Sequence, residues 1–152
     1  MDFISFCTLS ERKGMGIKML KGLKSIEHIG IHSEDTKKLT DWYCDTLGLE
    51  VTFEMKKDQP EKSIYFLKGL DGTIIEILPS NENKIKRELN DSGFSHIGIN
   101  VDNFKEVEEQ LKARGVVFDN IRETSMGWTI GYFNDPDGNT LEIVYRPQGE
   151  KI

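Results

Sequence analysis

The segment IEHIGI at residues 26–31 returns as FSHIGI at residues 94–99, and this repeat decides how the rest of the chain is interpreted. A second segment, DGTIIEI at residues 71–77, returns as DGNTLEI at residues 137–143. The first pair is separated by 68 positions and the second by 66. Two independent matches at nearly one separation indicate a tandem duplication within the chain.

Each copy shows the same order of expected elements. A short alternating strand comes first, at 26–32 and at 94–101, and an amphipathic helix follows it. These helices are expected to end at Gly48 and Gly115, because glycine accepts the left-handed conformation at a helix end. Three strands complete each copy, with an Asp-Gly hairpin signal between the last two. The sequence therefore predicts an α+β fold made of tandem βαβββ modules.

The expected boundaries leave two segments outside the modules. Residues 1–24 are expected to form a flexible leader. Residues 81–92 are polar and are expected to link the modules, with a helical stretch around 84–89. The first module then covers residues 25–80 and the second covers residues 93–147.

The composition limits the classes of function. A net charge of −6 argues against nucleic-acid binding, which needs a basic surface. No stretch approaches the 18 or more apolar residues of a membrane span, so a cytoplasmic protein that does not bind membranes is expected. Two cysteines, Cys7 and Cys44, lack the CxxC spacing of structural zinc sites and are interpreted as inert thiols.

Strand parity places a histidine and a glutamate of each module on the same side of its sheet. Side chains alternate between the two sides of a strand. The apolar neighbours of His28 and His96 point to the side that the helix covers, so both histidines point to the opposite side. Glu76 and Glu142 alternate in the same way with the apolar residues of the last strands. If the two sheets form one curved surface, all four side chains meet in its hollow.

Two imidazoles and two carboxylates suit a divalent transition metal, such as zinc, nickel, cobalt, manganese or iron. The set does not choose among these ions. The alternative is that the residues form two hydrogen-bonded pairs without a metal, His28 with Glu76 and His96 with Glu142. A glutamate within an apolar strand is costly unless it is paired, and its recurrence at matching positions favours metal binding.

At these residues the chain resembles the vicinal oxygen chelate superfamily, which includes glyoxalase I, methylmalonyl-CoA epimerase, extradiol dioxygenases and fosfomycin-resistance transferases. The resemblance covers about residues 26–146. It rests on HIGI at 28–31, on WYCDTLGL at 42–49 and on NDPDGNTLE at 134–142. It implies a U-shaped mixed sheet around a metal cleft, with His28, Glu76, His96 and Glu142 as ligands.

The ligand set is most similar to that of bacterial-type glyoxalase I. The resemblance then implies a metal-dependent isomerase or lyase that moves a proton beside a carbonyl through a metal-bound enediolate. Glu142 would be the base and Glu76 its partner across the cleft. The alternatives are a CoA-thioester epimerase, although epimerases usually carry Gln where Glu76 stands, and a non-catalytic resistance-type binding protein.

The expected substrate is a small molecule whose identity the sequence leaves open. Glutathione-dependent relatives carry Arg and Asn four residues after the first and second ligands, where this chain has His32 and Ser80. A different thiol adduct, a CoA ester or another dicarbonyl compound fits as well. His32, Asn100 and Trp128 are the candidate substrate contacts. Relatives build the site within one chain or between two, and we expect a homodimer.

Overall fold

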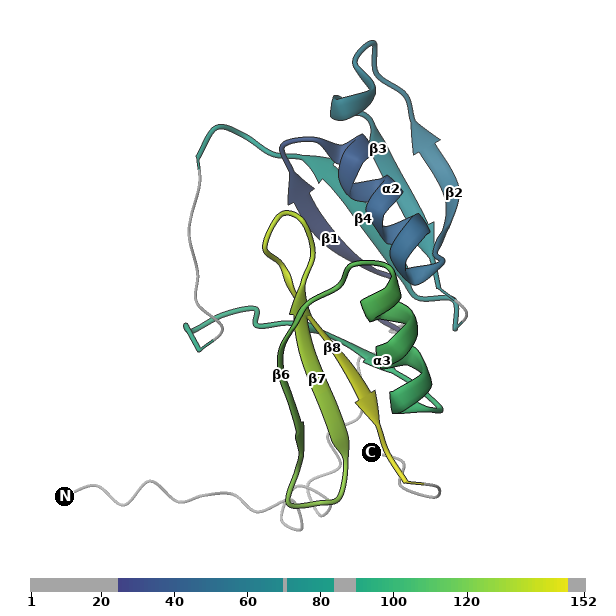
Figure 1. The fold of residues 1–152 in the computed structure, drawn as a ribbon. Coiled ribbons are helices and arrows are strands. Elements are labelled where there is room, and N and C mark those ends of the chain that lie inside the picture. The colour runs from purple at the N-terminus through teal and green to yellow at the C-terminus, as the bar shows by residue number, and fades with distance from the viewer. Residues whose placement is uncertain (1–24, 70, 84–89, 148–152) are drawn as a thin grey trace, which may run out of the picture.

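The structure, a computed structural model, describes residues 25–69, 71–83 and 90–147. The expected leader at residues 1–24 and the helical stretch expected at residues 84–89 lie outside these described residues. Within the described residues, the α+β fold of tandem βαβββ modules is confirmed (Figure 1).

Module 1 forms a four-stranded sheet in the order β1-β4-β3-β2. The first strand runs parallel to β4, and the other neighbours are antiparallel. Its elements are β1 (His28–Ser33), α2 (Thr36–Leu47), β2 (Glu50–Met55), the short helix η1 (Pro60–Lys62), β3 (Ile64–Lys68) and β4 (Ile74–Pro79).

Module 2 repeats this arrangement in a second sheet, with the order β5-β8-β7-β6 and one parallel pair, β5 with β8. The eight strands within the described residues are therefore divided equally between two sheets, one in each module. The elements are β5 (Ile97–Asn100), α3 (Phe104–Ala113), β6 (Phe118–Glu123), β7 (Thr129–Asn134) and β8 (Thr140–Tyr145). The first strand of this module is shorter than the expected 94–101, and Phe94 before it is 67 % exposed.

Both helices begin and end where their local sequence requires. The Asp35 carboxylate accepts a hydrogen bond from the backbone N–H of Lys38, and the Asn103 side chain accepts one from that of Glu106. Each contact satisfies a backbone donor that the first helical turn leaves without a partner. Gly48 ends α2 with a φ of 72°, a left-handed conformation that costs glycine little.

Each helix covers one face of its own sheet and leaves the other face for the candidate site. In module 1 helix α2 lies against one face of the sheet, and α3 does the same in module 2 (Figure 1). Buried side chains of both helices belong to the hydrophobic core. This packing removes the apolar side chains from water, which is the main favourable term in folding. The buried core consists of Ile31, Leu39, Tyr43, Leu67, Ile75, Ile77, Phe104, Leu111, Val116, Phe133, Leu141 and Ile143.

Polar contacts fix the turn between β7 and β8 against module 1. The Tyr43 hydroxyl donates a hydrogen bond to Asp135 Oδ2 over 3.0 Å, and both residues are buried. The buried Ser33 hydroxyl donates to Asp137 Oδ2 over 2.5 Å. In Figure 1 this turn reaches toward the end of β1. We call these two contacts, which join residues far apart in the sequence, the module latch.

The buried charge in the latch is satisfied from several directions. Asp135 Oδ1 accepts hydrogen bonds from the backbone N–H groups of Asp137 and Asn139, and Asp135 Oδ2 accepts one from the Asn139 side chain. Burial nevertheless raises the pKa of Asp135, while these contacts and the Tyr43 hydroxyl act in the opposite direction. Burial also raises the pKa of Tyr43, so its hydroxyl remains a neutral donor. None of the described helices is long and apolar enough to cross a membrane.

Candidate metal centre

Module 1 brings one imidazole and one carboxylate together on the face of its sheet opposite α2. The His28 Nε2 atom lies 3.3 Å from Glu76 Oε2. The pairing of β1 with β4 sets Gly30 beside Glu76, and a side chain added at Gly30 would come within 3.8 Å of that same oxygen. A side chain at this position would also stand 3.4 Å from Leu78 Cδ1, so glycine avoids contact with both neighbours. The His28 side chain is 42 % exposed and that of Glu76 is 17 % exposed, so solvent reaches the pair.

The second ring nitrogen of His28 has its own partner. His28 Nδ1 contacts the carboxylate of Glu27, the preceding residue. This hydrogen bond raises the pKa of His28, with smaller contributions in the same direction from the charges of Glu27 and Glu76. A carboxylate on one nitrogen fixes the orientation of the ring and increases the basicity of the other nitrogen, an arrangement common among metal-bound histidines.

Module 2 contains the equivalent pair. His96 Nε2 lies 3.2 Å from Glu142 Oε2, and their side chains are 30 % and 13 % exposed. The partner of His96 Nδ1 is the Ser95 hydroxyl at 2.9 Å, a neutral group in the position that Glu27 occupies in module 1. Gly98 stands beside Glu142 across β5 and β8, as Gly30 stands beside Glu76.

A tyrosine adjoins the pair of module 2. The ring of Tyr132 meets that of His96 edge-on, with centroids 5.3 Å apart and planes at 89°. Burial raises the pKa of the Tyr132 hydroxyl, and the neighbouring Glu142 carboxylate raises it further through its charge and a hydrogen bond. The hydroxyl is therefore a proton-bearing donor beside the carboxylate of Glu142.

The structure brings the four predicted ligands together as two pairs. Among the described residues, no three His, Cys, Asp or Glu side chains come close enough to hold one metal ion. The two pairs belong to separate sheets, and each faces away from the helix of its own module. The meeting of all four ligands in one hollow therefore stays a prediction, which needs a second chain or a different placement of the modules.

The three predicted substrate contacts lie in different environments. His32 is exposed on the same side of β1 as His28, and its Nδ1 lies 3.0 Å from the carbonyl oxygen of Pro79. Asn100 is exposed at the end of β5, on the same side as His96. Trp128 is half-buried just before β7, and the Arg146 guanidinium lies 4.5 Å from its ring centroid. His32 and Asn100 thus flank the pairs, whereas Trp128 packs against a cation.

Sequence reasoning did not select several residues around the pairs. Strand registers place Phe66 opposite Glu76 in module 1 and Tyr132 opposite Glu142 in module 2. Applying strand parity to β3 and β7 as well would have found both residues. The residue before each histidine, Glu27 or Ser95, could have been found by comparing the two copies position by position.

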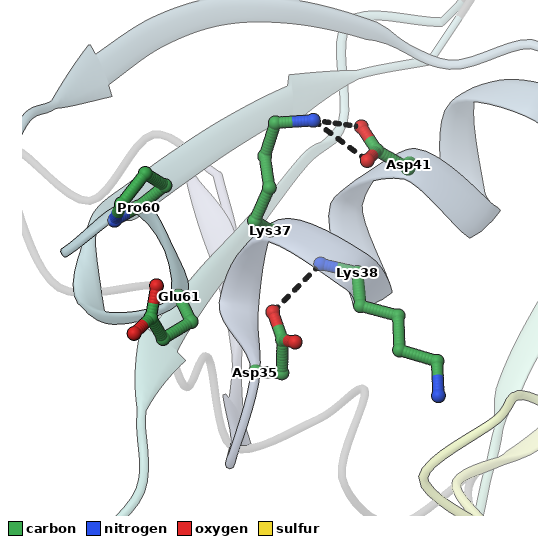
Figure 2. Close-up of a pocket in the computed structure, with 6 residues that line it drawn as sticks. All are labelled: Asp35, Lys37, Lys38, Asp41, Pro60 and Glu61. Carbon is green, nitrogen blue, oxygen red and sulfur yellow. Dashed lines mark hydrogen bonds and ion pairs between the residues drawn. The ribbon is translucent and has the colours of Figure 1, made fainter.

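Two surface depressions lie elsewhere on the described part of the chain. One, of about 470 Å³, borders the start of α2 and η1, and the other, of about 500 Å³, borders the start of α3. Figure 2 shows the first, where the Lys37 ammonium contacts both carboxylate oxygens of Asp41 at 2.6 Å. Asp35 accepts a hydrogen bond from the backbone N–H of Lys38 in the same depression. Neither depression includes a His–Glu pair.

Comparison with known proteins identifies the family of the chain and several proteins of similar sequence and structure. A sequence model described as "Glyoxalase/Bleomycin resistance protein/Dioxygenase superfamily" matches residues 25–143. "Uncharacterized protein YaeR" of Escherichia coli (strain K12) is 28 % identical over 127 residues, covering 80 % of this chain and 96 % of that protein. The crystal structure of a glyoxalase family protein from Enterococcus faecalis has a TM-score of 0.68 and 26 % identity, covering 80 % of this chain and 97 % of that one.

The fold is also similar to that of a solved enzyme structure. The crystal structure of lactoylglutathione lyase from Agrobacterium tumefaciens has a TM-score of 0.62, with 82 % of this chain and 96 % of that one covered. Its identity is 20 %, so this likeness concerns the fold alone.

Proposed function

Because the chain belongs to the Glyoxalase/Bleomycin resistance protein/Dioxygenase superfamily, we propose that its two His–Glu pairs jointly bind one divalent metal ion and catalyse proton transfer beside a carbonyl group. The family name covers enzymes and resistance proteins, so membership alone does not choose between catalysis and binding. The observation that carries the proposal is the duplicated pair, in which each imidazole Nε2 lies within 3.3 Å of a glutamate oxygen on an accessible sheet face.

The residues fit a divalent metal ion by their chemistry and their surroundings. Imidazole nitrogens and carboxylate oxygens form a mixed set that accepts zinc, nickel, cobalt, manganese or iron. In both modules the Nδ1 atom has its own partner, and the Nε2 atom lies beside the glutamate. His28, Glu76, His96 and Glu142 would hold the ion, which would supply Lewis-acid chemistry to neighbouring oxygens of a substrate.

We propose that the four ligands meet between two copies of the chain. The latch fixes the turn of module 2 against module 1 through Tyr43 and Ser33, both of which are buried. In the arrangement that these contacts hold, no three candidate ligand side chains of the described residues come together. A two-fold symmetric dimer instead lets the module 1 pair of each chain meet the module 2 pair of the other, which generates two equivalent sites.

The proposed reaction assigns different tasks to the two carboxylates. When bound, the metal ion would act as a Lewis acid toward the substrate oxygens. Glu142 removes a proton from the carbon beside a carbonyl and returns it to the adjacent carbon, so that the product is an isomer of the substrate. Tyr132 holds a hydroxyl next to Glu142 and orients its carboxylate. Glu76 faces the substrate from the other module.

Metal loading and turnover together test this function. The protein is purified, stripped with a chelator, reloaded with each divalent ion and assayed with methylglyoxal in the presence of several thiols. We expect isomerisation that requires the ion and that exceeds the rate with the stripped protein by at least about a hundredfold. Metal binding with no turnover for any thiol or other hydroxy-carbonyl compound would instead favour a binding protein.

Complementation between inactive chains tests the shared site. His28→Ala and His96→Ala chains are each expected to be inactive, because every site of either homodimer lacks one ligand. After the two chains are unfolded and refolded together, mixed dimers contain one intact site, and about a quarter of the wild-type activity should return. If the mixture remains inactive while wild-type protein treated in the same way recovers, the site lies within one chain.

A further inference from the structure

The two modules present different surfaces beside their His–Glu pairs. In module 1, strand pairing sets Phe66 opposite Glu76 and Phe53 opposite Phe66. In module 2 the equivalent positions beside Glu142 hold Tyr132 and then Asn120. The residues of each row are direct cross-strand partners, so their side chains share the face of the glutamate.

The row in module 1 is apolar although much of it is exposed to water. The Phe53 side chain is 56 % exposed, and its ring packs edge-on against Phe66 with centroids 5.6 Å apart. Met55, two residues further along β2, is 46 % exposed. We call Phe66, Phe53 and Met55 the aromatic strip. A contiguous exposed apolar surface indicates that something binds there, whereas single exposed apolar residues do not.

The fold does not require this surface to be apolar. Module 2 has the same strand order and the same register, yet Asn120 takes the position equivalent to Phe53. Arg122, two residues further along β6, takes the position equivalent to Met55 and is exposed. Polar residues are therefore compatible with the sheet at these positions, and the apolar character of the strip is a property of module 1 alone.

From this difference we infer that the substrate carries an aromatic or branched apolar substituent that lies on the aromatic strip while its two oxygens lie at the metal ion that Glu76 would help hold. The inference rests on the function proposed above and adds the class of substrate. Side chains directly opposite one another on a sheet lie about 5 Å apart, which places Phe66 next to any group held at Glu76. Phe53 lies one strand further away, about 10 Å from Glu76, so the strip matches a substituent with the length of a phenyl ring.

Two chelating probes that differ in this substituent test the inference. Acetohydroxamate and benzohydroxamate each offer two neighbouring oxygens, but only the second carries a ring. Their affinities for the metal-loaded protein are measured by calorimetry and divided by their affinities for the free ion. We expect the corrected ratio to favour benzohydroxamate by at least about tenfold, because its ring leaves water. A corrected ratio near unity would overturn the inference.

Variants that copy module 2 into module 1 identify the surface responsible. Phe53→Asn introduces the residue of the equivalent position, and we expect it to reduce the preference for benzohydroxamate by about threefold or more. The control is Val117→Asn, because Val117 is 79 % exposed and follows α3, away from both pairs. An unchanged preference in Phe53→Asn would overturn the inference. So would conversion of Phe53→Asn to a monomer, because the strip would then be a contact between two copies.

A measurement on the metal-free protein separates this inference from the proposed function. Met55 and Met126 are both exposed, one in each module. The methyl signal of each is assigned and followed by NMR. We expect benzohydroxamate to shift the signal of Met55 and not that of Met126, with little effect from acetohydroxamate. If the protein binds no metal but Met55 responds in this way, the proposed function fails and the strip remains a binding surface. Shifts at Met126 alone would overturn the inference.

Discussion

The two modules are alike in their sheets and in their His–Glu pairs, and they differ in what surrounds those pairs. A carboxylate, Glu27, adjoins the histidine of module 1, whereas a hydroxyl, that of Ser95, adjoins the histidine of module 2. Across the sheet, Phe66 stands opposite the glutamate of module 1 and Tyr132 opposite that of module 2. Under the proposed function, the duplicated scaffold supplies two equivalent ligand pairs, and the residues beside each pair distinguish the two halves.

Replacing each carboxylate by an amide tests most directly whether Glu142 and Glu76 have separate tasks. Glu142→Gln should reduce turnover by about a thousandfold while the metal remains bound, because the proposed base is lost. Glu76→Gln should reduce turnover much less, by about tenfold, because Gln still offers an oxygen to the metal. Activity is measured as kcat, and bound metal by elemental analysis. Glu109→Gln, an exposed position on α3, serves as the control and should change neither quantity.

Equal losses in the two amide variants would contradict the separate tasks, although the shared metal site would stand. Full activity of Glu142→Gln would remove the proposed base from the mechanism. Retention of metal in both variants is necessary for either conclusion, since loss of the ion would explain a loss of turnover equally well.

The proposed site between two chains requires that the module latch holds the two modules of a chain in one arrangement. Tyr43→Phe removes a donor from the buried Asp135, and we expect the free energy of unfolding to fall by about 1–3 kcal/mol. The measurement is urea denaturation. Tyr65→Phe is the matched control, because the Tyr65 hydroxyl donates to the carbonyl oxygen of Pro60 within module 1. A Tyr43 variant no less stable than this control would show that the latch contributes little to holding the modules together.

The effect of Tyr43→Phe should depend on pH in a defined direction. Burial raises the pKa of Asp135, so the fold is relatively more stable when this group is protonated and loses that stability as pH rises through the raised pKa. The Tyr43 hydrogen bond lowers the pKa of Asp135 and thus offsets part of the loss. Removing it should cost more at neutral pH than in mild acid, as urea denaturation at both pH values would reveal. A larger cost in acid would contradict this account.

The smallest expected effect concerns the residue before each histidine. Glu27→Gln should lower the pKa of His28, because the Glu27 carboxylate is the main cause that raises it. The pKa is followed by NMR on the metal-free protein, with the exposed Glu50→Gln as the control within the same module. An unchanged His28 titration in Glu27→Gln would mean that the two histidines are not distinguished by these neighbours.

Repeat spacing and strand parity were enough to predict the modules and the pairing within each one. Parity put His28 and Glu76 on one face, and their side-chain atoms do lie 3.3 Å apart. These features are local or depend on alternation along strands, so they leave a periodic signal in the sequence. Polar residues on β1 and β5, such as His32 and Asn100, also lie on the predicted side.

No periodic pattern in the sequence indicates how the two modules are placed relative to one another. It depends on a few buried polar contacts, such as that between Tyr43 and Asp135, which are 92 positions apart. Neither residue type nor spacing identifies that partnership, because a tyrosine on a helix face and an aspartate in a turn each have common local roles. The sequence therefore could not decide whether one chain or two supply the four proposed ligands.

Counting metal ions per chain tests the central claim most directly. Wild-type protein, His28→Ala and His96→Ala are dialysed against the same divalent ion, and bound metal is measured by elemental analysis. If both pairs hold one ion jointly, the wild type should bind about one ion per chain, and each variant should lose nearly all of it. Two ions per wild-type chain, with half retained in each variant, would show that the pairs act separately and would contradict the account.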